Sequence, residues 1–243
     1  MNKLPRQTQR TGWWMHGQLP GMFHISKMEL RHISEYNIKT TDYIEKESQK
    51  FRSNIEDYIK SHKLDDEQEV GFTESVSEEY SMLHSFFPVV LRYSILVSSC
   101  SLLESTLTNI CKHLDSSSKF TVSKEWKDIS INHGALNRIK IFLNNNFKIS
   151  IGESTQWSSI KDIYEIRNCI THANGDISLM KDPEKTKTII KKQAKNGVSL
   201  SEFNIIQIND KFLNYSNQLL VYFLSELESA CKENDILGPP HWP

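Results

Sequence analysis

The chain has 243 residues, with 29 lysines and arginines against 30 aspartates and glutamates and a formal net charge of −1. This balance excludes a protein that coats duplex nucleic acid through its overall charge, so any RNA contact must rest on a local basic patch. The low hydrophobic share of 38%, with only 9 glycines and 7 prolines, favours a mostly helical protein over a β-sandwich.

The first 75 residues are predicted to be an N-terminal extension. Residues 1 to about 27 have no clear hydrophobic period, and Trp13-Trp14 and Met22-Phe23 predict that this segment packs on another surface, such as a second subunit. From about Met28 to His62, apolar residues recur in steps of three, four and seven, which indicates one amphipathic helix. The acidic stretch from Asp65 to Glu79 contains a glycine and is expected to be a connection.

The most apolar part of the chain lies in a helix predicted from about Glu78 to Leu114. Pro88 should kink this helix or start a new one, because proline has no N–H to donate. The apolar residues after Pro88 cover more than half of the circumference, which indicates the centre of a helical bundle. Because Arg92 and several serines interrupt the stretch Phe86–Leu103, we expect a buried helix there and not a membrane span.

The rest of the chain is predicted to hold further helices and one hairpin. Asn132–Asn145 is a short helix, and Ser154–His172 is a helix with a Ser154-Thr155 cap and a stop at Ala173-Asn174-Gly175. A lysine-rich helix from Pro183 to Lys195, a short β-hairpin near residues 197–208 and a long helix from Asp210 to Glu233 follow. We therefore predict an all-α protein with an extension (1–75), a bundle of four or five long helices (76–233) and a tail (234–243).

Most enzyme signatures are missing from the sequence, including phosphate loops, dinucleotide fingerprints, HExxH and GxSxG. Asp, Glu and His form no cluster with metal-ligand spacing, so neither a metal nor another cofactor is expected. The four cysteines are scattered, which is typical of reduced thiols. The N-terminus has positive charges without the apolar core of a signal peptide, so we expect a cytoplasmic protein.

The run Arg167-Asn168-Cys169-Ile170-Thr171-His172 carries the clearest chemistry. A guanidinium binds phosphate oxygens bidentately and stabilises the charge of a pentacoordinate transition state. An imidazole takes or gives a proton near neutral pH. RNA supplies its own nucleophile, the 2′-hydroxyl, so Arg167 and His172 could cleave RNA without a metal.

The spacing of Arg167 and His172 raises a geometric problem. In an unbroken helix five residues correspond to about 500°, so the two side chains point about 140° apart. They converge if the helix ends or loosens near Thr171, or if a second copy completes the site.

The run from Arg167 to His172 resembles the RxxxxH motif of the HEPN superfamily, including the asparagine that follows the arginine. The context is similar: Leu102-Leu103-Glu104-Ser105 lies in a long apolar helix upstream, and a long helix follows Gly197-Val198-Ser199-Leu200. The resemblance covers about residues 76–233. It implies a four-helix bundle whose dimer forms one RNA-cleaving cleft, as in ribonucleases that act as toxins or phage-defence effectors.

The resemblance also implies roles for individual residues and partners. Arg167 would bind and polarise the phosphate, His172 would be the general acid or base, Asn168 would orient the motif or the phosphate, and Glu104 would face the cleft. The implied partners are the RNA substrate, a second copy of the chain and an antitoxin or other defence-system protein, with no membrane.

Each of these residues also has a plainer interpretation. Arg167 could form a salt bridge to Glu165 or Asp162, and His172 could complement the helix dipole. Glu104 could face solvent or pair with a nearby cation, Arg92 or Lys112. The basic concentration after the motif is either an RNA backbone track or an ordinary solvated face, and comprises Lys181, Lys185, Lys187, Lys191, Lys192 and Lys195.

Two functions of this chain therefore stay open. Nucleotide-transfer chemistry or its regulation is a weaker third, which a partner would have to supply because this chain lacks the metal-binding carboxylates. The first is an endoribonuclease that works by 2′-hydroxyl attack. The second is a non-catalytic HEPN-like module that binds a partner protein or RNA, which the neutral net charge and the amphipathic N-terminal helix favour.

Overall fold

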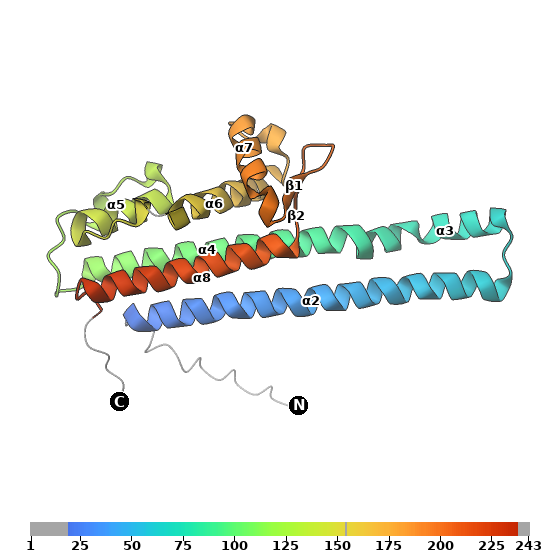
Figure 1. The fold of residues 1–243 in the computed structure, drawn as a ribbon, viewed down its shortest axis with the longest axis horizontal. Helices are drawn as coiled ribbons and strands as arrows, with labels where there is room; N and C mark the ends of the chain where they lie inside the picture. Colours follow the sequence, from blue (N-terminus) through green and yellow to red (C-terminus); the bar gives the residue numbers. More distant parts are fainter. Residues whose placement is uncertain (1–18, 154, 238–243) are drawn as a thin grey trace, which may run out of the picture. The chain divides into compact units, whose positions relative to one another are not determined.

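The structure, a computed structural model, describes residues 19–153 and 155–237 and is mostly helical, so the all-α prediction is confirmed (Figure 1). The helices are α2 (Leu19–His62), α3 (Asp66–Ser81), α4 (Phe87–Ser116), α5 (Ala135–Phe147), α6 (Thr155–Ala173), α7 (Pro183–Gln193) and α8 (Asp210–Glu233). Strands β1 (Val198–Leu200) and β2 (Ile206–Ile208) form an antiparallel pair.

The described residues form two compact units, each made of several chain segments. The first unit comprises residues 19–31, 99–163 and 217–237, and the second comprises His32–Ser98 and Tyr164–Ser216. Helices α2, α4, α6 and α8 each contribute residues to both. The division into an extension, a bundle and a tail stays a prediction.

Polar contacts and aromatic packing hold the first unit together. The Ser26 and Thr106 hydroxyls hydrogen bond at 2.7 Å, so α2 lies against α4. The Asn217 side-chain amide donates to the Leu30 carbonyl at 2.7 Å, which ties α8 to α2. Trp157, at the start of α6, is buried.

Helix α2 contains the predicted helix of residues 28–62 but begins earlier, at Leu19. Pro20 lies in its first turn, where a missing N–H leaves no helical bond unmade. Phe23 is fully buried, in agreement with the packing expected of Met22-Phe23. Trp13-Trp14 lies outside the described residues.

The prediction that Asp65–Glu79 is a connection is wrong, because α3 occupies this stretch. Its start is a capping box: the Asp65 carboxylate accepts from the Gln68 amide at 2.9 Å, and the Asp65 amide donates to Gln68 Oε1 at 3.2 Å. Asp66, Glu67 and Glu69 in the first turn suit the helix dipole. No residue of α3 is buried, so the helix lacks the apolar stripe by which helices are recognised.

Pro88 does not break the helix, which runs without interruption from Asp66 to Ser116. A π-helical turn, Met82–Phe86, joins α3 to α4, and the Phe87 amide donates to the Met82 carbonyl. The cause is local: Pro88 has no N–H for the His84 carbonyl, so the preceding turn widens.

The prediction of a buried central helix holds for only part of α4. Ile95, Leu96, Leu103, Leu107 and Ile110 are buried, whereas large apolar side chains near Pro88 are exposed. Among the described residues, the helix Asp66–Ser116 is the one long and apolar enough to cross a membrane by length and composition, and 28% of its most apolar window is buried.

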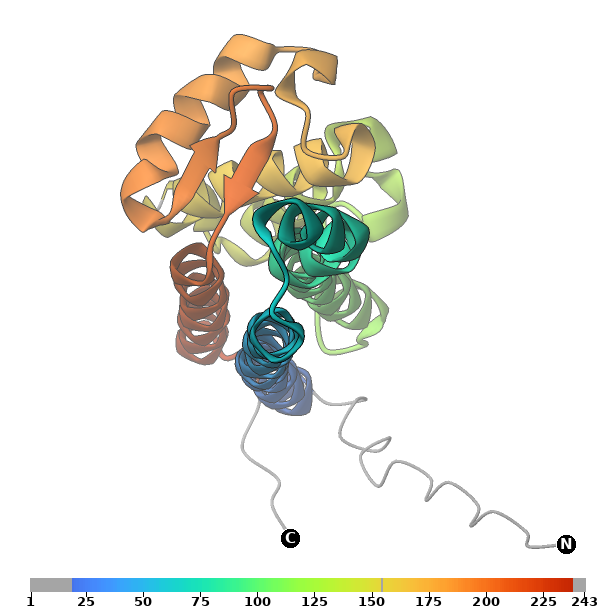
Figure 2. The same ribbon diagram turned by 90° about the vertical axis from the view of Figure 1, so that its right-hand side faces the viewer.

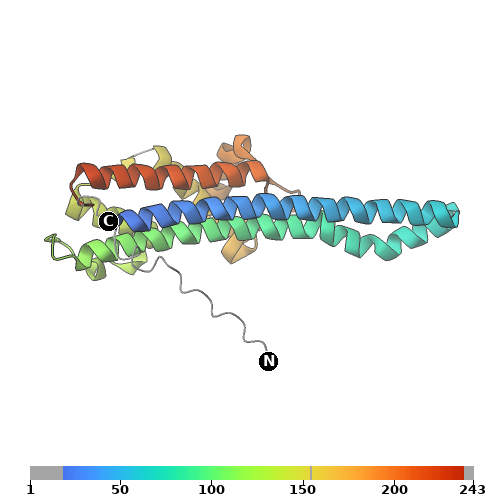
Figure 3. The ribbon, with the colours of Figure 1, turned by 90° about the horizontal axis from the view of Figure 1, so that it is seen from below.

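In the second unit, the later part of α2 runs antiparallel to α3 and the start of α4 (Figures 1 and 3). The predicted hairpin is confirmed, with Val198 paired to Ile208 and Leu200 to Ile206. It packs beside α7 and the chain segment that follows α6 (Figure 2).

Candidate functional site

The Arg167–His172 run occupies the last turns of α6. The buried side of this part of the helix consists of Ile163, Ile166, Cys169, Ile170 and Ala173. The helix ends at Ala173, as predicted. Asn174 and Gly175 follow with φ of 50° and 84°, and the Gly175 amide donates to the Cys169 carbonyl at 3.1 Å. The Ser154 part of the predicted cap lies outside the described residues.

The segment after α6 is fastened to the hairpin. The Ile206 amide donates to the Gly175 carbonyl at 2.9 Å, and the Ile177 amide donates to the Asn204 carbonyl at 3.2 Å. Asp176 and Ile205 form an isolated β-bridge. These bonds hold the end of the motif helix in one position.

Tyr93 of α4 completes this fastening and was not predicted from the sequence. Its hydroxyl donates to the Ile206 carbonyl at 2.5 Å. A Cβ on Gly175 would overlap the same hydroxyl, so the glycine is required both by its positive φ and by the close approach of Tyr93. The sequence feature that could have indicated this contact was Gly175. A glycine at this position was already explained by the predicted helix stop.

Arg167 and Asn168 interact directly. Arg167 is half-buried and its Nη1 donates to Asn168 Oδ1 at 3.0 Å. The Thr171 hydroxyl donates to the Arg167 carbonyl at 2.8 Å, as in an intact helix. The side-chain oxygen of Asn168 thus holds one nitrogen of the guanidinium, and the role of Asn168 in a site stays a prediction.

His172 is exposed, and α6 stays α-helical through it. The helix thus does not loosen near Thr171, and Arg167 and His172 leave its axis about 140° apart. Asn168 and His172, four residues apart, share one face. A single copy of α6 presents the two catalytic candidates on opposite flanks of its buried side.

Glu104 is half-buried on α4 and belongs to the first unit, whereas the motif belongs to the second. Its role in a cleft stays a prediction. Arg92, one of its expected partners, binds Asp210 at 3.2 Å.

The predicted basic track is divided by the geometry of α7. Lys185 and Lys192 lie on one flank of the buried stripe Thr186, Ile190 and Gln193, and Lys187 and Lys191 lie on the other, about 130° away. Lys185 binds Glu165 at 2.6 Å and Lys187 binds Glu184 at 2.8 Å. Two lysines of the predicted track are therefore partly neutralised, and Lys181 precedes the helix.

Cys169 and Tyr93 lie inside the site but do not supply a nucleophile. Burial, with help from Asp176 and Glu165, raises the pKa of Cys169 to about 11. Burial and the neighbouring Cys169 raise the pKa of Tyr93 to about 12. Both groups keep their protons at neutral pH, so their role is to pack the end of α6.

Two hollows of the second unit meet at Arg92. One, of about 510 Å³, lies between Tyr93 and the hairpin, and the other, of about 420 Å³, is lined by α2, the π-turn and Asp210. Arg92 Nε is buried without a hydrogen-bond partner. Neither hollow is lined by Arg167 or His172.

Among the described residues, no three His, Cys, Asp or Glu side chains are grouped so that they could hold a metal ion. Comparison with protein-family models, curated proteins and solved structures found no match to this chain.

Proposed function

We propose that the protein is a metal-independent endoribonuclease with a HEPN-like helical bundle, and that two copies complete its site. The observation that carries the proposal is the hydrogen-bonded pair Arg167–Asn168 and the exposed imidazole of His172 at the end of α6. Just after this helix, Gly175 and Tyr93 both hydrogen bond to Ile206 of the hairpin. The proposed cell role is that of a toxin or phage-defence effector, with an antitoxin or another defence protein as partner.

The proposed chemistry needs only RNA and these side chains. His172 of one copy takes the proton from a 2′-hydroxyl, and the resulting oxygen attacks the adjacent phosphorus. The bond from phosphorus to the 5′ oxygen breaks, the leaving oxygen takes a proton from water, and His172 returns the proton it abstracted to the solvent. Arg167 holds the phosphate oxygens and offsets the charge of the transition state. The products are a 2′,3′-cyclic phosphate and a 5′-hydroxyl.

The 140° separation is the reason for invoking a second copy. A twofold axis places Arg167 of one copy opposite His172 of the other, and the same contact forms twice. In this arrangement Lys181 and Lys191 would contribute to substrate binding.

The test is cleavage of a structured RNA by purified protein in excess EDTA, with the product ends identified. We expect cyclic phosphate ends from the wild type and a loss of at least about a hundredfold in Arg167→Ala and His172→Ala. Arg52→Ala and His133→Ala are matched controls, because both residues are exposed and distant in sequence from the motif. Full activity of both motif variants would refute the proposal.

A second candidate function is a non-catalytic module that binds a partner protein or RNA. The observation that favours it is that one chain neither brings Arg167 and His172 together nor gathers the lysines of α7 on one face. Stable binding of RNA, with no cleavage by the wild type at any protein concentration, would support this function over the first.

A further inference from the structure

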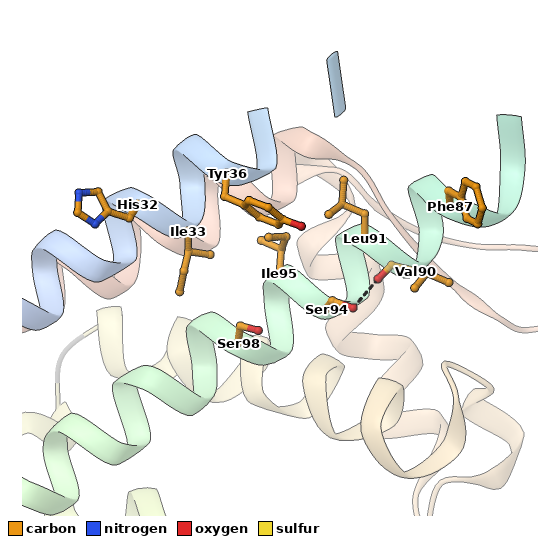
Figure 4. A pocket seen from close by; sticks show the side chains of 9 residues that line it. All are labelled: His32, Ile33, Tyr36, Phe87, Val90, Leu91, Ser94, Ile95 and Ser98. Atoms are coloured by element: carbon orange, nitrogen blue, oxygen red, sulfur yellow. Dashed lines mark hydrogen bonds between the residues drawn. The ribbon is translucent and has the colours of Figure 1, made fainter. Parts of the chain in front are cut away.

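The hollows of the second unit differ in the chemistry that they offer to a ligand. The one of about 540 Å³ between α2 and α4 is lined by Ile33, Tyr36 and Ile95 among others, and none of its lining residues is a lysine, arginine, aspartate or glutamate (Figure 4). It therefore lacks a fixed charge with which to select a ligand. The two hollows that meet at Arg92 have such a charge.

Arg92 leaves most of its hydrogen-bonding capacity unused. A guanidinium has five N–H donors. Within the described residues Arg92 donates one hydrogen bond, from Nη2 to Asp210 Oδ2 at 3.2 Å, and its Nε is buried without a partner. The other oxygen of Asp210 accepts from Asn37 Nδ2 at 3.3 Å, so the carboxylate does not make the two parallel bonds that hold a guanidinium best. The Arg92 side chain is 25% exposed, which leaves it accessible to an anion.

The hollow of about 510 Å³ between Tyr93 and the hairpin is the one in which no carboxylate competes for this guanidinium. Among the described residues that line it, Arg92 is the one with a formal charge. Its other polar lining residues are hydroxyl and amide side chains, namely Tyr93, Ser199, Gln207 and Asn209.

The hollow of about 420 Å³ on the other side of Arg92 is different. It is lined by the carboxylates Glu45 and Asp210 as well as by Arg52 and Arg92, so its charges offset one another. An anion is therefore favoured in the hollow beside the hairpin.

The remaining walls of that hollow are apolar. Val198, Ile206 and Ile208 of the hairpin line it, together with Val89 of α4. Its volume lies within the range of about 300–1,000 Å³ that is typical of sites for small organic ligands. A ligand that fills it has an apolar body beside its anionic group.

The wall made by the hairpin is fixed before any ligand arrives. Gly197 has a φ of 103°, and a Cβ there would overlap the Asn209 side chain. The Asn209 amide donates to the Gly197 carbonyl at 3.1 Å, and the Phe212 amide donates to Asn209 Oδ1 at 3.2 Å. These bonds join the hairpin to the start of α8, and a preformed wall reduces the entropy lost on binding.

We propose that the hollow between Tyr93 and the hairpin binds a small organic anion, a carboxylate or a phosphate monoester with an apolar body. The guanidinium of Arg92 binds the anionic group, and the exposed side-chain amides of Gln207 and Asn209 supply further N–H donors. Arg167 and His172 do not line this hollow, so the proposal does not rest on ribonuclease activity.

The test is the binding of phenyl phosphate and benzoate, measured by isothermal titration calorimetry and by saturation-transfer NMR of the ligand. Benzamide serves as the uncharged analogue of benzoate. The protein is the full chain with Arg167→Ala, because in the proposed function Arg167 itself binds a phosphate. We expect saturable binding of both anions at one site and at least about tenfold weaker binding of benzamide.

Three variants locate the site. Gln207→Glu keeps the shape of the side chain and places a carboxylate at the hollow, so phenyl phosphate should bind at least about fivefold more weakly. Gln49→Glu is the matched control, because Gln49 is also exposed but lines the other hollow, and we expect no change. Arg92→Lys keeps the charge without the fork of donors and should weaken binding at least about threefold. If the loss of the Asp210 contact unfolds Arg92→Lys, Gln207→Glu, at an exposed position, still decides the question.

Four outcomes would overturn the proposal. The first is no saturable binding of either anion up to about 10 mM. The second is benzamide that binds as tightly as benzoate. The third is binding that Gln49→Glu weakens or that Gln207→Glu leaves unchanged. The fourth is a short single-stranded RNA that loses affinity in Gln207→Glu while neither small anion binds, which would assign Arg92 to a nucleic acid. None of these measurements reads cleavage, so the proposed nuclease function and this site stand or fall separately.

Discussion

Gly175 is the residue at which the backbone geometry and the packing of the candidate site depend on each other most directly. Its φ of 84° and the Tyr93 hydroxyl at the position of a Cβ both exclude a side chain. Because Tyr93 also donates to Ile206, a change at Gly175 displaces the bond that fastens β2 to α4.

We expect Gly175→Ala to lower the free energy of unfolding by about 1–3 kcal/mol, from strain at a positive φ and displacement of Tyr93. The measurement is urea denaturation followed by circular dichroism. Gly71→Ala is the opposite control: Gly71 lies inside α3 with open space around it, so alanine should stabilise that helix by up to about 1 kcal/mol. Equal effects of the two substitutions would contradict this account.

Tyr93 also predicts how stability changes in alkali. Its pKa is raised to about 12 in the folded protein by burial and by Cys169. An unfolded tyrosine loses its proton near pH 10, so the folded state holds the proton more tightly and its stability falls as the pH rises from about 10 to about 12. Tyr93→Phe should cost about 1 kcal/mol at pH 8 through the lost hydrogen bond and should then lose less stability than the wild type at pH 11. Urea midpoints of both proteins at the two pH values measure this difference. The titration of groups other than Tyr93 affects both proteins equally and therefore cancels.

At the residue scale, what could be predicted from the sequence depends on how far apart the interacting residues lie along the chain. The stop at Ala173–Gly175 could be predicted because it depends on adjacent residues. The bond from Tyr93 to Ile206 joins residues 113 positions apart, and nothing in the local sequence of either indicates the other. The division of the α7 lysines is different, because the helical period of Thr186, Ile190 and Gln193 would have shown it in advance.

Among the elements, the predictions succeeded where an apolar period exists. The bounds of α8, Asp210–Glu233, are those predicted from the sequence, and α5 is displaced by only a few residues. Helix α3 was missed because none of its residues is buried, although the spacing of Asp65 and Gln68 is that of a capping box. The π-turn could not be predicted, because a proline can equally be accommodated by a kink or a new start.

The exposed position of α3 makes its cap a local feature. We expect Asp65→Ala to cost about 1 kcal/mol of helix stability, so that the amides of the first turns of α3 exchange with solvent about fivefold faster. Because α3 buries no residue, the melting temperature should hardly change. Hydrogen exchange resolved to peptides measures the effect, with Asp57→Ala, an exposed position within α2, as the control. A cooperative loss of the whole fold would show that α3 is packed more tightly than its exposure indicates.

At the scale of the whole molecule, the basic patch after the motif is weaker than the number of lysines in it suggests. Lys185 and Lys187 are bound to Glu165 and Glu184, so the region after the motif presents less positive charge than its composition suggests. The all-α class could be predicted from composition and breakers. Whether a site forms could not, because in the proposed function it depends on how Arg167 and His172 of different copies meet.

The composite site proposed here predicts that two inactive variants rescue each other. If each site takes Arg167 from one copy and His172 from the other, a dimer of Arg167→Ala with His172→Ala contains one intact site and one that lacks both groups. Random pairing of equal amounts makes half of the dimers mixed, so about a quarter of the wild-type RNA cleavage should return on co-expression. The measurement is cleavage in EDTA by the co-purified mixture, compared with each variant alone at the same total concentration. If Arg167 and His172 of a single chain form each site instead, no dimer of the two variants contains a complete site. The mixture then stays as inactive as each variant alone.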